Sequence, residues 1–76
     1  MQEKLKTLKN NESILLLMSA EHNARLTLLE SGIDYENYDN QDLLNTYTLL
    51  SIEDALSFGD VSADVVAEFA SIGIEA

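Results

Sequence analysis

The sequence predicts an all-α protein, a small bundle of three to four short helices in which residues 1–76 form one domain. Three observations predict this class. Proline is absent, so no helix is interrupted by a residue that lacks a backbone donor. The three glycines each follow a segment with helical periodicity, the place where a left-handed residue ends a helix. An apolar content of 46% argues against disorder despite the high charge.

The first helix is expected to begin between Asn10 and Ser13 and to end at Ser31, with a separate or continuous turn before it through Leu5 and Leu8. Apolar residues at steps of three and four give this helix two stripes. The first stripe consists of Leu15, Met18, His22, Leu26, Leu29 and Ile33. The second consists of Leu17, Ala20, Ala24 and Leu28. Either both stripes pack inside one bundle, or the second stripe forms an oligomer interface or contacts a target.

The next segment, residues 34–40, is polar and turn-forming, so it is expected to be a loop that leads into a helix capped by Asp39 or Asn40. That helix would pack through four apolar side chains, Leu43, Leu44, Tyr47 and Leu50. The β-branched and aromatic residues between positions 46 and 52 leave a short strand open as the alternative.

A second short helix is expected from Ile52 to Phe58. Ser51, with Asp54 three positions later, resembles a capping box and therefore predicts a break in the chain direction at Ser51.

The last helix is expected to begin at Asp60 or Ser62 and to end at Gly73. It carries one apolar stripe at helical spacing, formed by Val61, Val65, Phe69 and Ile72. Gly32 and Gly73 are both followed by isoleucine, the apolar residue that packs back on the last turn in a Schellman cap.

Catalytic and metal chemistry is not indicated by the residue types present. His22 is the only histidine, and its place in an apolar stripe predicts a packed residue rather than a base. Without cysteine, neither a disulfide nor a zinc cluster can be assembled. Four acids, Asp34, Glu36, Asp39 and Asp42, follow the first helix, but their spacing is not that of an EF-hand calcium loop. Counted from Asp34, such a loop requires glycine at position 39 and glutamate at position 45, where this chain has Asp39 and Asn45. We expect no enzyme, no metal and no cofactor.

The charge is distributed unevenly along the chain. All four Lys and Arg residues precede position 26, so residues 1–25 carry a net charge of +1. Residues 26–76 contain eleven carboxylates and no Lys or Arg, which brings the whole chain to −10. A protein with this charge distribution attracts cationic surfaces.

Two groups of residues are the candidate partner-binding surface. Asp60, Asp64 and Glu68 recur every fourth residue and would form a ridge of carboxylates on the last helix. The second group lies in and beside the loop and consists of Asp34, Tyr35, Glu36, Tyr38, Asp39 and Asp42. Aromatic residues among acids can anchor an interface while the carboxylates steer approach. A solvated acidic face, and tyrosine rings folded over the core, remain the alternatives.

Residues 55–66 resemble a helix-turn-helix, in which a turn containing glycine joins two helices. The resemblance rests on Ala55, Gly59, Val61, Ser62, Val65 and Val66. The second helix would, however, present Asp64 and Glu68 to phosphates, whereas DNA-binding helices use Lys and Arg. We therefore expect no direct binding of nucleic acid.

The sequence thus predicts a small acidic module that binds a protein with a basic surface and occludes a nucleic-acid-binding site on it. Analogy with phage-encoded antagonists and DNA mimics predicts an inhibitor with an anti-defence role. The alternative is a self-assembling structural or accessory subunit, a homo-oligomer or virion component, held by the second stripe. The longest apolar run, Ile14 to Met18, is too short to span a bilayer, so we expect a cytoplasmic protein without a membrane partner.

Overall fold

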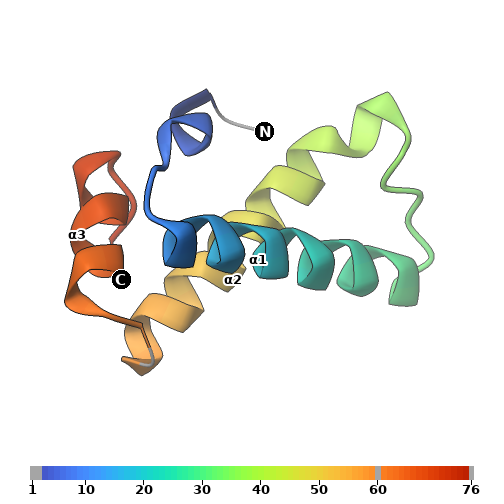
Figure 1. The fold of residues 1–76 in the computed structure, drawn as a ribbon. Coiled ribbons are helices and arrows are strands. Elements are labelled where there is room, and N and C mark those ends of the chain that lie inside the picture. The colour runs from blue at the N-terminus through green and yellow to red at the C-terminus, as the bar shows by residue number, and fades with distance from the viewer. Residues whose placement is uncertain (1–2, 60, 76) are drawn as a thin grey trace.

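The computed structural model describes residues 3–59 and 61–75, and all the regular structure in them is helical (Figure 1). The α-helices are α1 (Asn11–Glu30), α2 (Gln41–Phe58) and α3 (Ala63–Ser71). Two 3₁₀ helices, η1 (Glu3–Thr7) and η2 (Tyr38–Asn40), precede α1 and α2. The predicted all-α class is confirmed, and positions 46–52 are helical rather than a strand.

The pairing of α1 with α2 is the largest contact between elements. In Figure 1, α2 runs back behind α1 and crosses it, while α3 lies at the end where α1 begins and α2 finishes. The buried residues of α1 include Ala20, Ala24 and Leu28, spaced by four. Those of α2 have the same spacing and are Leu44, Thr48, Ile52 and Leu56. The small alanines allow the two helices to approach closely.

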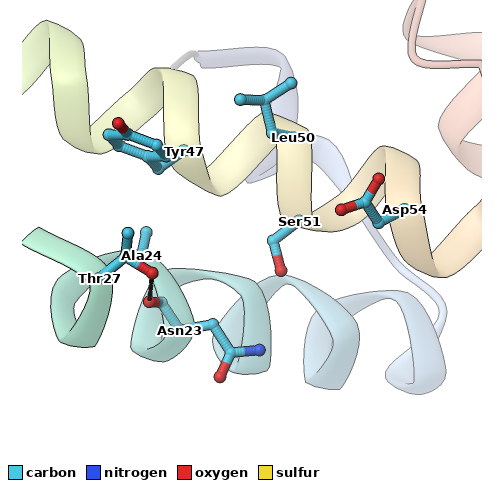
Figure 2. Close-up of a pocket in the computed structure, with 7 residues that line it drawn as sticks. All are labelled: Asn23, Ala24, Thr27, Tyr47, Leu50, Ser51 and Asp54. Atoms are coloured by element: carbon cyan, nitrogen blue, oxygen red, sulfur yellow. Dashed lines mark hydrogen bonds between the residues drawn. The ribbon is translucent and has the colours of Figure 1, made fainter.

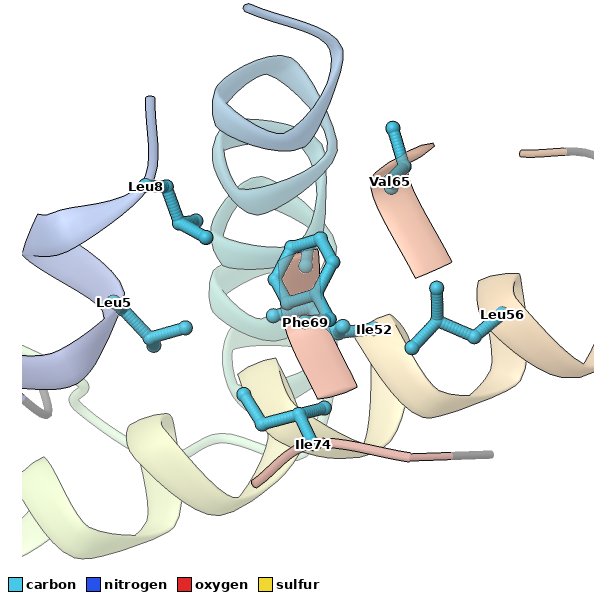
Figure 3. Packing of buried hydrophobic residues seen from close by; sticks show 8 residues of the cluster. Leu5, Leu8, Ile52, Leu56, Val65, Phe69 and Ile74 are labelled. Atoms are coloured by element: carbon cyan, nitrogen blue, oxygen red, sulfur yellow. The ribbon is translucent and has the colours of Figure 1, made fainter. Parts of the chain in front are cut away.

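Two apolar clusters form the core. The larger surrounds Phe69 of α3, which is fully buried among residues from η1 to the C-terminal segment (Figure 3). It includes Leu5, Leu8, Ala20, Ile52, Leu56, Val65 and Ile74. The smaller cluster consists of Ala24, Leu28 and Leu44, with Ile33 and Tyr35 packed against it. The turn predicted through Leu5 and Leu8 is therefore a separate element that closes one end of the bundle.

Capping residues set the limits of α1 and α3 as the sequence predicted. The Asn10 side chain accepts a hydrogen bond from Glu12 N at 2.9 Å, and Ser62 accepts one from Val65 N at 3.4 Å. Both helices end in a Schellman motif: Ile33 N donates to Leu28 O and Ile74 N donates to Phe69 O, each at 2.9 Å. Gly32 and Gly73 adopt the positive φ angles, +74° and +89°, that this motif requires.

The two apolar stripes of α1 differ in burial, so the bundle does not bury both of them. Four members of the first stripe, Leu15, Met18, Leu26 and Leu29, are exposed. His22 is exposed as well, so the prediction of a packed histidine is wrong. The second stripe is the one that packs inside the chain: Ala20, Ala24 and Leu28 are buried and Leu17 is half-buried against the larger cluster. The second stripe thus packs inside the bundle, as the first of the two alternatives has it for this stripe, and its four residues are not exposed as an oligomer interface.

The predicted break at Ser51 is wrong, because α2 continues through it to Phe58. The predicted packing face is also rotated: of its four members only Leu44 is buried. Thr48 takes a core position instead, and its hydroxyl donates to Leu44 O at 2.8 Å. With the hydroxyl satisfied inside the helix, a β-branched polar residue can be buried there.

Replacement of Phe69 tests the larger cluster. Phe69 is 0% exposed and Phe58 is 79% exposed, so the same change at the two positions separates burial from composition. Phe69→Ala should lower the free energy of unfolding by about 3–5 kcal/mol, comparable with the whole stability of a small domain. Phe58→Ala should change it by less than about 0.5 kcal/mol. Urea unfolding followed by circular dichroism would measure both, and similar losses would contradict this core.

Candidate functional site

The acidic side chains beyond position 26 lie almost entirely on the surface. The structure describes ten of the eleven, and all except Glu68 are exposed. Among the described side chains, the one ion pair joins Arg25 to Glu21 at 3.3 Å, and both belong to α1. Within the side chains that the structure describes, no Lys or Arg forms an ion pair with the acids beyond position 26.

The structure divides the predicted partner-binding residues between two ends of the molecule. The loop group lies between α1 and α2, at one end of the helix pair, and α3 lies at the other end (Figure 1). The molecule is 36 Å long in its longest direction. Asp60 lies outside the described residues. The eight that are described therefore do not form one continuous surface.

The Glu68 carboxylate is hydrogen-bonded to other residues of the chain. It accepts hydrogen bonds from Lys9 N at 3.0 Å and Asn10 N at 3.3 Å, the residues that directly precede α1. Backbone N–H groups at this position lie at the positive end of the helix dipole, where a carboxylate is favourable. The contact fastens α3 to the start of α1 and removes Glu68 from the predicted ridge, of which only Asp64 is described and exposed.

Several groups hold the pKa of Glu68 below its ordinary value of 4.5. The largest effect comes from the Ser13 hydroxyl, followed by the Lys9 N–H, the Asn10 N–H and the Lys9 charge; partial burial opposes them. Ser13 Oγ is buried and makes no hydrogen bond of full geometry within the described residues. The hydrogen bonds that hold the Glu68 carboxylate in place are therefore the two from the backbone of Lys9 and Asn10.

The loop between α1 and α2 is fixed by two side chains that accept from the backbone two residues later. Asp34 Oδ1 accepts from Glu36 N, and Asn37 Oδ1 accepts from Asp39 N, both at 3.0 Å. Such Asx turns set the chain direction without help from a neighbouring element.

Two amide side chains close the same loop from its far end. Asn40 Nδ2 donates to Asp34 O at 2.8 Å, and Gln41 Nε2 donates to Tyr35 O at 2.9 Å. The loop therefore has a defined conformation before any partner arrives, and its acids Asp34, Glu36, Asp39 and Asp42 are all exposed.

The two loop tyrosines have different environments. Tyr35 is half-buried and packs against the smaller core cluster, as the folded-back alternative predicted. Tyr38 is 88% exposed at the start of η2. Sequence reasoning did not separate them; the signal is the Schellman cap at Gly32, whose Ile33 brings the chain and Tyr35 back onto the core. The exposed ring among exposed carboxylates is the candidate site, here called the acidic loop, residues 34–42.

A groove of about 290 Å³ lies between α1 and α2, lined by Asn23 and Thr27 on one side and by Tyr47, Leu50 and Asp54 on the other (Figure 2). The Thr27 hydroxyl already donates to Asn23 O at 2.9 Å. His22 does not line the groove. Ser51 lines the groove as well, so its polar groups are three hydroxyls, the Asn23 amide and the Asp54 carboxylate.

Neither a metal centre nor a membrane-spanning segment is found in residues 3–59 and 61–75. No group of three or more metal-ligating side chains is close enough to hold an ion. In the same part of the chain, every helix is too short or too polar to cross a bilayer.

Comparison with known protein families, curated proteins and solved structures gives no significant match. The function is therefore inferred from the charges and exposed groups of the chain itself.

Glu68→Gln tests the contact between α3 and α1. The pKa of Glu68 is lowered on folding, so its stabilising effect is present above pH 4.5, the ordinary value, and is lost as pH falls through the lower folded-state pKa. The variant should be less stable than the wild-type chain at about pH 7, and the difference should shrink at about pH 3. Chemical unfolding at the two pH values measures this.

The matched control is Glu75→Gln, which removes the same charge from an exposed position. It should leave the stability at neutral pH nearly unchanged. If the two variants behaved alike, or if the deficit of Glu68→Gln persisted in acid, the contact would not contribute through its charge.

Proposed function

We propose that this chain is a small acidic binding module that docks its acidic loop on a basic protein surface. The observation that carries the proposal is Tyr38, an aromatic ring 88% exposed on a loop held by its own side-chain hydrogen bonds. Solvent-exposed aromatic rings are enriched at the centres of protein interfaces. A loop of fixed conformation also loses little conformational entropy on binding.

The carboxylates around Tyr38 give the module its choice of partner. Glu36, Asp39 and Asp42 are exposed and form no ion pair within the described side chains. They can therefore pair with Lys and Arg on another protein, with Tyr38 supplying the apolar contact. Pairs of this kind raise the association rate and weaken as salt screens them, with a Debye length of about 10 Å at 0.1 M.

Occlusion is the mechanism that this chemistry supports. A protein surface that holds phosphates does so with Lys and Arg, the same side chains that carboxylates bind. The module would then exclude DNA or RNA competitively, as a DNA mimic does. An antagonist encoded by a phage against a host defence protein is one setting in which such competition is useful.

The test begins with the partner. The chain is immobilised, exposed to host lysate at low salt and eluted with salt, and the eluted proteins are identified by mass spectrometry. The affinity of the chain for the captured protein is then measured over a salt series. Displacement of a fluorescent oligonucleotide from that protein tests the occlusion directly.

Two triple variants, each of which removes three carboxylate charges, test where the partner binds. Glu36→Gln with Asp39→Asn and Asp42→Asn neutralises the acidic loop; Glu53→Gln with Asp54→Asn and Glu75→Gln neutralises three exposed acids elsewhere. The loop variant, and Tyr38→Ala alone, should weaken binding by about tenfold or more. The control variant should weaken it by clearly less, because it reduces only long-range attraction. Affinity that is insensitive to salt and unchanged in the loop variant would refute the proposal.

A further inference from the structure

The outward face of α1 carries a line of exposed side chains, four of them large and apolar and the fifth a histidine. This outer stripe consists of Leu15, Met18, His22, Leu26 and Leu29. The leucines and the methionine are 63%, 59%, 43% and 56% exposed in chain order, and His22 is exposed. The opposite face of α1 is the one that packs on α2, which crosses behind α1 in Figure 1. Apolar side chains gathered on one face mark an interaction surface.

The spacing of the outer stripe is symmetric about its central residue. Leu15 and Leu29 each lie seven positions from His22, and Met18 and Leu26 each lie four positions from it. In an antiparallel pair of α1 helices with a two-fold axis at His22, residue i faces residue 44−i of the second copy. Leu15 then meets Leu29, Met18 meets Leu26, and His22 meets His22. A two-fold interface requires this self-complementarity.

The charges of α1 also favour a second copy of this acidic chain here rather than elsewhere. Between residues 13 and 29, Glu21 and Arg25 cancel, so the centre of α1 is neutral in a chain of −10. The exposed apolar residues of α2 lie instead beside Asp42, Glu53 and Asp54. A like-charged copy meets less repulsion on α1 than on α2.

In the same register the ion pair of α1 extends across the interface. Arg25 and the second copy's Glu21 are offset by two residues, an axial rise of about 3 Å. Both side chains lie on the same flank of the outer stripe, where Arg25 already contacts Glu21 of its own helix at 3.3 Å. Each copy thus offers a cation to the other copy's anion.

We propose that two copies of this chain associate through their outer stripes as an antiparallel, two-fold symmetric helix pair. Five side chains per copy bury less than the roughly 800 Å² per partner of a standard stable interface, so the dimer is weak and reversible. The inference does not depend on the proposed function, but the two are compatible. An antiparallel pair holds its two acidic loops at opposite ends, and such a dimer can engage two basic sites.

Analytical ultracentrifugation of the wild-type chain up to about 1 mM tests the association. We expect a concentration-dependent dimer that strengthens from about 0.05 M to about 0.5 M salt, because salt screens the repulsion between two anions. This trend is opposite to that expected for the basic partner. A strict monomer over the whole range, or dissociation by salt, would overturn the proposal.

Matched aspartates locate the interface. Leu26→Asp and Leu50→Asp change leucines of similar exposure, 43% and 48%, on α1 and α2. Leu26→Asp should weaken the dimer by at least about tenfold, since each copy brings a charge to the interface. Leu50→Asp should leave it nearly unchanged, with circular dichroism reporting the fold of each variant. Equal effects, or a larger effect at Leu50, would contradict this interface.

Cysteine cross-linking tests the register, because the chain has no cysteine of its own. In the proposed pair His22→Cys brings two thiols together at the two-fold axis, within the Cα separation of about 7 Å that a disulfide tolerates. Ser19→Cys, one turn away and also exposed, places the two thiols six residues apart, about 9 Å along the axis. Mild oxidation should cross-link the first variant and not the second. The reverse order would exclude the register.

Discussion

The close packing of α1 on α2 is the contact on which the rest of the structure depends. Ala20 packs with Ile52 and Leu56 in the larger cluster, and Ala24 and Leu28 pack with Leu44 in the smaller one. Ala20, Ala24 and Leu28 lie on the inner face of α1, whereas Leu15, Met18, Leu26 and Leu29 are exposed on the outer face. The packing that stabilises the monomer therefore also leaves an apolar surface of α1 exposed to solvent.

Local signals in the sequence predicted the ends of the helices, and tertiary packing decided what lay between them. The limits of α1, the apolar stripe of α3 and both Schellman caps follow from residues within a few positions of each other. The packing face of α1 could not be predicted in this way, because two apolar stripes with the same periodicity look alike in sequence. Which of them is buried depends on how α2 packs against α1. The break predicted at Ser51 failed for a related reason, because a local capping pattern has less weight than eighteen residues packed as one helix.

In the candidate site, too, local signals in the sequence predicted some features and tertiary packing decided the others. The abundance of unpaired acids was evident from the charge distribution, but their separation into two ends of the molecule was not. Glu68 accepts from backbone groups 58 and 59 positions away, a partnership that no local pattern reveals. Likewise, adjacent turns placed Tyr35 on the core and Tyr38 in solvent. Glu68 therefore contributes to the fold, while the other acids beyond position 26 that the structure describes are exposed to solvent.

The larger core cluster joins the two extremes of the chain. Leu5 and Leu8 pack with Phe69 and Ile74, and the start of α1 is fastened by Glu68. Ala20, Ile52 and Leu56 belong to the same cluster, so α1 and α2 supply one side of it and α3 with Ile74 supplies the other. The α1–α2 hairpin can therefore form before α3 docks, but the larger cluster is closed only when Phe69 and Ile74 have joined it, which makes the docking of α3 the step that completes folding.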